Sequence, residues 1–460
     1  MKTLNYKAMR GHDRLITRTK RRVTMKFTKT LKYSAVAFVA SLGLIGCSNQ
    51  EETATKVDLV TSTGDGVTVE FWHNMNGAFA ETIDSIVSDF NSTIGAEKGI
   101  TVNATYQGSY GDLKAKTMAA IKSGQSPHIV QGTINNIHEL IQSEYIQDLT
   151  DYINHPEIGF DYEDIFESYR AEMSGYTSTG EIYSLPFAKS VDLLFYNEDF
   201  FTEHNLQVPT TWEETVEVSK QIRDITGKAG FCIDNLPNYL ITYLFQSGAP
   251  YTTQDGEILF NNETAVEAIE MLKQGIDEGY WRVPGEDNFS SGPFLAENVY
   301  MYLGSSAGEG FLHRDNFEWN TAVMPQVNVD KPNSPQQGAN IAIINQNKTS
   351  EEVYGSYEFI KYLVSTEVNT KWTMNTGYLP IRQSVLDSQV YQDYLTTVKG
   401  NVKVNGTTAS KDAFVEALFN NGAVSSSMVR DELNVMLESI ILQGEDIQEM
   451  LDYYSERLSY

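Results

Sequence analysis

From residue 67 onward, the hydrophobic positions switch repeatedly between two periods. Residues 67–72 (VTVEFW) alternate between apolar and polar as a strand does, and the apolar residues from Phe79 to Phe90 then recur every three or four positions as in a helix. Strands that alternate with helices of this length indicate βαβ units and a mostly parallel sheet. Further strands are predicted at 100–106, 128–132, 193–197, 299–303, 321–325 and 340–344, and further helices at 113–123, 134–141, from Thr211 and at 266–276, followed by a mainly helical C-terminal part.

This pattern falls into two blocks, which predicts two α/β lobes with a cleft between them. The first lobe is expected to comprise residues 67–190 plus 299–345, and the second lobe residues 191–298 plus 346–460. Within the second block, Thr211 stands three residues before Glu214, which is the spacing of a helix-starting capping box.

The chain before residue 67 has a different composition. Met25 is followed by lysines and then by the apolar run 35–45, which fits a secretory signal peptide and is too short to span a bilayer. The run ends in Leu44-Ile45-Gly46-Cys47, the order of a bacterial lipobox, in which the cysteine thiol receives the lipid. Residues 1–24 precede a methionine, Met25, that stands directly before the lysines of the signal peptide, which suggests Met25 as the true start.

These features predict the fate of the N-terminal part. We expect residues 1–46 to be an N-terminal extension plus a lipoprotein signal peptide, with Cys47 as the lipidation site. Residues 47–66 are rich in Ser, Thr and acidic residues and are expected to form a flexible tether. The protein would be exported and anchored to a membrane, facing the periplasm or the cell exterior.

Net charge excludes one class of function. The chain has a formal net charge of −27, and residues 1–46 hold 11 of its 34 basic residues and one of its 61 acidic residues, so the remainder has a net charge of −37. A field of that sign repels nucleic acid, and no basic patch interrupts it. Cys232 is the one cysteine left beside Cys47, so neither an internal disulfide nor a cysteine metal cage is expected.

The first predicted strand ends in a run of polar and aromatic residues. The predicted strand ends at Trp72, His73 and Asn74, and a predicted helix follows after a turn at Asn76-Gly77. Open α/β sheets bind ligands just beyond the carboxyl ends of their strands. We predict a loop at the rim of a cleft, in which Trp72 and His73 serve shape and packing and Asn74 contacts the ligand, with no metal and no catalysis.

Residues 304–308 (GSSAG) match the nucleophile motif G-x-S-x-G after an apolar strand. A hydrolase triad would need an acid and then a histidine further along the chain, but His313 follows Ser306 by only seven residues, with Glu309 between them. We therefore interpret the motif as a turn of small residues whose N–H groups and hydroxyls suit a polar ligand. A secreted lipoprotein hydrolase, either a serine esterase or a glycosidase with an unidentified carboxylate pair, remains the alternative.

Metal and nucleotide motifs are absent from the sequence. The histidines form no H-E-x-x-H pair, and there is neither a Walker loop nor a G-x-G-x-x-G run. We expect no cofactor.

Seven motifs follow one another in one order along the chain. They are FWHNM (71–75), YQGSYGDLKAK (106–116), LPFAKSVDLLFYNEDFF (185–201), PTTWEE (209–214), LGSSAG (303–308), QGANIAI (337–343) and NTGYLPI (375–381). Together they resemble the family of extracellular solute-binding proteins of ABC importers, closest to the branch that binds glycerol-3-phosphate and oligosaccharides. The resemblance implies two α/β lobes with a hinge, a solute trapped in the interlobe cleft, and delivery to a membrane permease without chemistry.

The resemblance also nominates ligand-binding residues. The matched positions are the tyrosine of the second motif, a serine of the third, the serine turn, a glycine backbone contact and a tyrosine donor. They correspond to Tyr110, Ser190, Ser305, Ser306, Gly338 and Tyr378.

Two departures from the family pattern leave the ligand open. Gly111 stands where a glutamate is expected, with Asp112 beside it, and the phosphate-binding arginine falls near Ser426. Lys189 and Arg430 are the nearest substitute cations. We include Asp112, Lys189 and Ser426 among the predicted ligand-binding residues, and the alternative for Lys189 is a solvated surface lysine. We therefore expect a monomeric receptor for a small polar solute, either a glycerol phosphate or glycerophosphodiester or a sugar, with an ABC permease as its partner.

Overall fold

The computed structural model describes residues 58–287, 289–312, 316–411, 413–416, 418–420 and 423–459. The predicted signal peptide, the lipidation site Cys47 and most of the predicted tether lie outside these residues, as does His313. Among the described residues, no helix is long and apolar enough to cross a membrane.

The strands and helices predicted from periodicity are present, but β4 begins eight residues before the predicted strand 193–197 and β9 six residues before the predicted strand 340–344. The strands are β1 (Val67–His73), β2 (Ile100–Tyr106), β3 (Ile129–Gly132), β4 (Leu185–Asn197), β5 (Ala229–Ile233), β6 (Trp281–Arg282), β7 (Val299–Ser305), β8 (Trp319–Val323), β9 (Ser334–Ile343) and β10 (Ala413–Phe414). The longer helices are α1 (Gly77–Ser92), α3 (Tyr110–Lys122), α4 (Ile134–Gln142), α6 (Glu167–Ser174), α8 (Trp212–Thr226), α9 (Leu236–Gln246), α10 (Glu263–Asp277), α12 (Ser350–Leu363), α13 (Thr366–Asn375), α16 (Val402–Lys411), α17 (Ser426–Glu438) and α18 (Ile447–Leu458).

The sheet is mixed, which corrects the prediction of a mostly parallel sheet. Its order is β2-β1-β3-β9-β4-β7-β5-β6, with β10 paired to β9 and β8 paired to β4. The pairs of β1 with β2 and β3, and of β5 with β6 and β7, are parallel. In the middle of the order, β9 runs antiparallel to β3 and β4, and β4 runs antiparallel to β7 and β8. Periodicity identifies a strand but carries no information on its direction.

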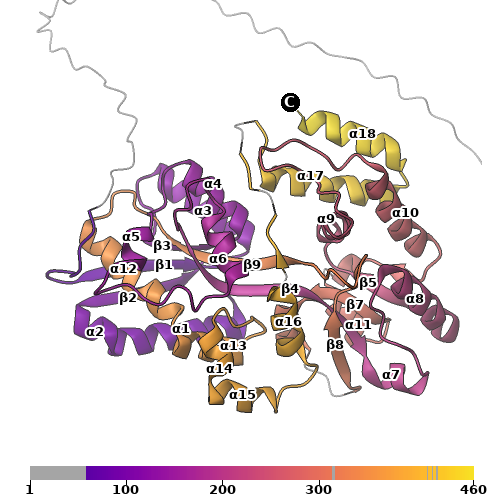
Figure 1. The fold of residues 1–460 in the computed structure, drawn as a ribbon, viewed down its shortest axis with the longest axis horizontal. Coiled ribbons are helices and arrows are strands. Elements are labelled where there is room, and N and C mark those ends of the chain that lie inside the picture. The colour runs from indigo at the N-terminus through magenta and orange to yellow at the C-terminus, as the bar shows by residue number, and fades with distance from the viewer. Residues whose placement is uncertain are drawn as a thin grey trace, which may run out of the picture. The chain divides into compact units, whose positions relative to one another are not determined.

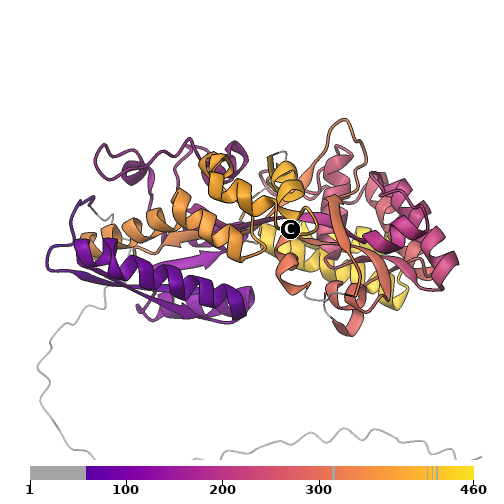
Figure 2. The ribbon, with the colours of Figure 1, turned by 90° about the horizontal axis from the view of Figure 1, so that it is seen from below.

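The β1–β3 part of the sheet has a hydrophobic core on each face, because alternate side chains of a strand point to opposite sides. Phe71, Ile129 and Ile341 pack with α1, α12 and α13 on one face, whereas Val130 and Ala342 pack with α3 and α4 on the other. Figure 1 shows α1 and the pair α3 and α4 on opposite sides of these strands, and Figure 2 shows α1 beside α12. We call the elements around these two cores the first lobe.

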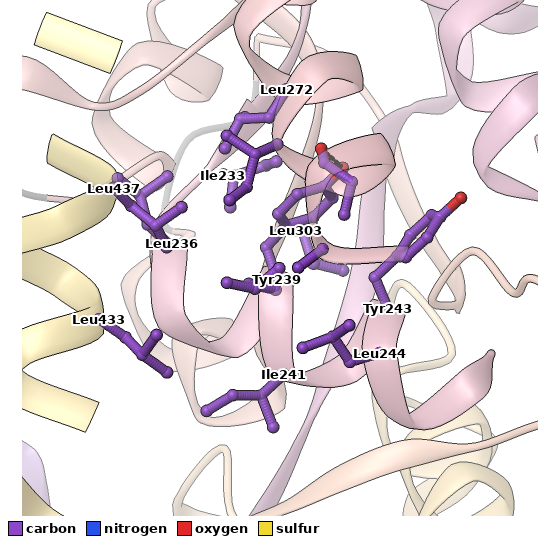
Figure 3. Packing of buried hydrophobic residues seen from close by; sticks show 14 of the residues in the cluster. Ile233, Leu236, Tyr239, Ile241, Tyr243, Leu244, Leu272, Leu303, Leu433 and Leu437 are labelled. Carbon is purple, nitrogen blue, oxygen red and sulfur yellow. Dashed lines mark hydrogen bonds between the residues drawn. The ribbon is translucent and has the colours of Figure 1, made fainter. Parts of the chain in front are cut away.

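The second lobe is built in the same way around β5 and β7. Phe231 and Ile233 point into a large core with α8, α9, α10 and α17, while Cys232 between them points into a smaller core with α16. Figure 3 shows α9 packed through Leu236 against Leu433 and Leu437 of α17. Helix α9 was not predicted, because residues around its whole circumference are buried and its sequence therefore lacks an amphipathic period.

The packing differs from the predicted lobe boundaries at two segments. β7 was assigned to the first lobe, but it pairs with β4 and β5 and packs in the second lobe. Residues 346–381 were assigned to the second lobe, but α12 and α13 pack against α1 and β1 in the first. An apolar face in the sequence predicts that a helix packs against a core, but it does not identify which lobe that core belongs to. β4 is shared, since Phe187 and Ala188 lie in the first lobe and Leu193 and Leu194 in the second.

Candidate binding cleft

A cleft of about 480 Å³ lies between the two lobes. Its walls are the starts of α3 and α4 in the first lobe and the starts of α9 and α17 in the second, and β9 forms its floor. α4 and α9 begin just after the carboxyl ends of the parallel strands β3 and β5, where open sheets bind ligands. Six side-chain amides line the cleft: Asn135, Asn136, Asn235, Asn238, Gln336 and Gln337. A more open hollow along α1 is lined by first-lobe residues alone, so it does not join the lobes.

Polar caps fix the helix starts around the cleft. Thr133 caps α4, and the Asn235 side chain accepts the Asn238 N–H at the start of α9 at 3.0 Å. Ser109 and Asp112 form a capping box on α3, in which the Asp112 carboxylate accepts the Ser109 N–H at 2.9 Å. Hydrogen bonds from Ser109 hold the pKa of Asp112 below its usual range. The predicted ligand residue Asp112 thus serves the helix cap and does not line the cleft.

The structure brings three of the predicted site residues together. Tyr110 lines the cleft, and its hydroxyl interacts with the side chains of Asn74 and Tyr378. Burial in this cluster raises the pKa of Tyr110. Tyr378 is stacked on Trp372 with ring centroids 5.5 Å apart, and the Asn74 N–H donates to Gln131 Oε1 at 3.2 Å. Two tyrosines and an amide therefore stand beside the first-lobe wall.

The remaining residues of the strand-end run serve packing. Trp72 packs on the α3 and α4 face of the first lobe. The His73 ring is buried and its Nδ1 accepts the Met75 N–H at 3.2 Å. Burial lowers the pKa of His73 to about 4, so the ring is neutral at physiological pH.

The hydroxyls of the serine turn at Ser305 and Ser306 form hydrogen bonds with the protein backbone. Ser305 ends β7 and its Oγ accepts the Ala307 N–H at 3.2 Å, which begins a 3₁₀ turn at Ser306–Phe311. Ser306 is fully buried and its Oγ accepts the Val191 N–H of β4 at 3.4 Å. Neither serine lines the cleft. A buried Oγ that already accepts a backbone N–H lacks the exposure that a nucleophile needs.

Lys189 is buried beside an acid, which corrects two expectations for it. Its Nζ lies 2.5 Å from Glu172 Oε2 and 3.4 Å from Asn340 Oδ1, and the residue is 1% exposed. It is therefore neither a cleft cation nor a solvated surface lysine. Ser190 is also buried, opposite Gln337 in the β4–β9 ladder.

Gly338, in contrast, does line the cleft. Its φ of +105° is a conformation that favours glycine, and an added Cβ would lie 2.0 Å from the Ala188 carbonyl oxygen.

Ser426 joins the two lobes rather than facing the cleft. It begins α17 of the second lobe, and its Oγ donates to Oδ1 of Asn135, on α4 of the first lobe, at 2.7 Å. One helical turn further on, Arg430 lines the cleft, forms an ion pair with Glu416 and donates to Asn238 Oδ1.

Sequence reasoning missed a buried carboxylate behind this wall. Asp192 on β4 accepts from Asn238 Nδ2 at 3.1 Å, and burial raises its pKa to about 6. The sequence feature that could have identified Asp192 is its position as the one acidic residue in the otherwise mostly apolar stretch 185–197. The amides Asn135, Asn238 and Gln336 were missed as well, because isolated Asn and Gln residues belong to no recognisable sequence motif.

The two basic side chains of the cleft lining each have an acidic partner. Lys114 Nζ lies 2.9 Å from Glu139, and Arg430 is paired with Glu416. Asp431 also lines the cleft. The lining therefore presents amides, hydroxyls and a tyrosine without an excess of positive charge.

Comparison with known proteins defines the class of the molecule. Residues 85–398 match the family model of the bacterial extracellular solute-binding proteins. The chain belongs to this family, and the comparisons support the solute-binding interpretation rather than the hydrolase alternative. Family members bind solutes rather than transform them.

Individual relatives agree with this assignment. The chain is 26% identical over 342 residues to the sn-glycerol-3-phosphate-binding periplasmic protein UgpB of Yersinia pestis, covering 71% of this chain and 76% of that protein. UgpB from Mycobacterium tuberculosis in complex with glycerophosphocholine has a TM-score of 0.75 at 19% identity, covering 85% of this chain and 98% of the other. The GacH receptor of Streptomyces glaucescens, solved unliganded and with acarbose, has a TM-score of 0.72 at 18% identity, covering 85% and 97%. These structural similarities confirm the two-lobed binding-protein fold.

Proposed function

We propose that the protein is the receptor of an ABC importer, which captures a small polar solute in the interlobe cleft and delivers it to a membrane permease. The observation that carries this proposal is a cleft lined from both lobes, with Tyr110 and Asn135 on one side and Asn238 and Arg430 on the other. A solute that touches both walls binds the closed form more tightly and so draws the lobes together.

For the solute, the cleft favours a neutral, hydroxyl-rich group. The UgpB relative from Yersinia pestis is named for sn-glycerol-3-phosphate, and the structural neighbours include complexes with glycerophosphocholine and with acarbose. A phosphate dianion is bound most strongly by cationic donors that are not already paired with an acid. Arg430 and Lys114 are instead matched by Glu416 and Glu139. Six amides supply the donors and acceptors that sugar or glycerol hydroxyls require.

The proposal includes the cellular setting. We infer a monomeric lipoprotein that is held by lipid at Cys47 and faces the periplasm or the cell exterior. The lipobox order at 44–47 supports the anchor. Globomycin, an inhibitor of the lipoprotein signal peptidase, should leave an uncleaved precursor of the wild type, and Cys47→Ser should abolish metabolic labelling with palmitate. Processing that is insensitive to both changes would refute the anchor.

A thermal-shift screen tests the receptor function. The wild type should be heated with maltose, maltotriose, sn-glycerol-3-phosphate and glycerophosphocholine, each at increasing concentration. A cognate solute stabilises the folded state by about 4 kcal/mol at a thousandfold excess over Kd. The solute should then be recovered chemically unchanged. Consumption of the solute would support a hydrolase, and the absence of any shift would contradict the proposed solute classes.

A further inference from the structure

Gln336 is an unusual residue among the amides of the cleft. It lies on β9 opposite Val191 of β4, and its side chain lines the cleft. Both its Oε1 and its Nε2 are buried, and neither has a hydrogen-bond partner among the described residues. No other amide side chain in the described part of the chain has both of its polar atoms in this state.

Such an arrangement is unfavourable unless a partner arrives from outside. A buried amide that forms no hydrogen bond loses its bonds to water without replacement, which is why most buried polar groups in proteins are paired. The unpaired amide of Gln336 lies at the floor of the cleft, where a bound solute would supply the missing hydrogen-bond partners.

Other lining amides already have protein partners. Asn135 accepts from Ser426, Asn235 caps α9, and Asn238 bridges Asp192 and Arg430. Gln337 lies beside Asp192, although its Nε2 is buried without a hydrogen-bond partner. These contacts fix the walls and leave both hydrogen-bonding functions of Gln336 for the ligand.

The backbone around Gln336 holds it in place. β9 pairs with β4 from Val191↔Gln336 to Leu185↔Ile341. Gly338, two residues on, lies so close to the Ala188 carbonyl that no larger residue fits without a shift. The Gln336 side chain therefore projects from a strand whose path is fixed before the ligand binds.

The chemistry of a free amide matches one kind of ligand group. Nε2 donates and Oε1 accepts, so a hydroxyl group, which does both, or two neighbouring hydroxyls can satisfy them together. A phosphate oxygen only accepts, and it would leave Oε1 unpaired beside a negative charge. We propose that Gln336 is a specificity-determining residue that binds a hydroxyl group of the solute as both donor and acceptor. This inference rests on the proposed receptor function.

Gln336→Met tests the inference, since methionine has a similar length and no hydrogen-bonding amide. Because the amide is unpaired in the ligand-free protein, the melting temperature of ligand-free Gln336→Met should equal or exceed that of the wild type. Its affinity for whichever of maltose, maltotriose, sn-glycerol-3-phosphate and glycerophosphocholine binds the wild type should fall about tenfold, measured by titration calorimetry.

Gln147→Met is the matched control. Gln147 is also a buried glutamine with an unpaired Oε1, but it donates to the Asp148 carbonyl and lies outside the cleft lining. Its replacement should leave the affinity unchanged.

The outcomes separate this inference from the proposed function. If the wild type binds a probe and Gln336→Met binds it equally well, the inference is overturned and the receptor function stands. A loss of several degrees in the melting temperature of ligand-free Gln336→Met would also overturn it, because the amide would then have a structural role. If the wild type binds none of the four probes, both proposals fall.

Discussion

Replacing Lys189 by methionine should destabilise the protein without changing its ligand specificity. In the folded state the ammonium group is held by Glu172, and Asn340 Nδ2 donates to the other Glu172 oxygen at 3.2 Å. Lys189 Nζ also lies 5.4 Å from the centroid of the Tyr169 ring. Glu172 is 3% exposed, so Lys189→Met leaves a carboxylate without its cation in the protein interior.

The expected loss follows from this burial. Removing one partner of a buried ion pair costs about 3–5 kcal/mol. With an unfolding entropy of about 2.1 cal/mol/K per residue, the melting temperature should fall by about 5–10 °C, the smaller value if both lobes unfold together and the larger if one unfolds alone. Differential scanning calorimetry measures this directly. Adding Glu172→Gln to Lys189→Met should restore much of the stability, because the double variant contains no unpaired buried charge.

A surface pair provides the control. Lys273 and Asp277 lie 2.5 Å apart on α10 with partly exposed side chains, so Lys273→Met should cost less than about 1 kcal/mol. The reasoning would be refuted if Lys189→Met kept its stability and instead lost tenfold or more in affinity for sn-glycerol-3-phosphate. That result would make Lys189 a ligand-binding cation.

Three further predictions concern other residues of the cleft and its surroundings. Because burial raises the pKa of Asp192 to about 6, the folded state binds this proton more tightly than the unfolded state, and the contribution of Asp192 to stability falls as pH rises from about 4 to about 6. Asp192→Asn should remove this part of the dependence of melting temperature on pH, and an unchanged curve would contradict the assignment. Gly338→Ala should cost about 3 kcal/mol or more in chemical denaturation, since its Cβ would overlap the Ala188 carbonyl at a φ of +105°; a neutral substitution would show that β9 can shift away from β4 at this position. Ser426→Ala should weaken solute binding about fivefold in titration calorimetry through loss of its bond to Asn135, and equal affinity would show that this bond contributes nothing to closure.

Local structure was predictable from the sequence where a single element decides its own pattern. Thr211 and Glu214 form the predicted capping box at the start of α8. The alternation in 67–72 and 100–106 corresponds to the parallel pair β1 and β2. These features depend on neighbours within a few residues, so sequence spacing suffices to find them.

Features that depend on distant segments were not predictable. Lys189 has an ordinary sequence context, and only the packing of α6 against β4 places Glu172 beside it. Asp112 looked like a cleft acid, but the capping geometry of Ser109 engages its carboxylate. The resemblance to the family located Tyr110, Gly338 and Tyr378 near the site. Gln336 could not be identified in this way, because its surroundings are determined by the pairing of β9 with β4 and no sequence motif marks it.

The hydrogen bond between Ser426 and Asn135 has a consequence for the timing of transport. It joins the two lobes, so a movement that separates the starts of α4 and α17 would have to break it. Such a bond is expected to act mainly on the dissociation rate, where most affinity differences at one site lie. A bond of about 1 kcal/mol lengthens the residence time of the solute about fivefold. The length of time for which the loaded receptor remains available to its permease is thus adjustable at Ser426, outside the cleft lining, without altering the groups that recognise the solute.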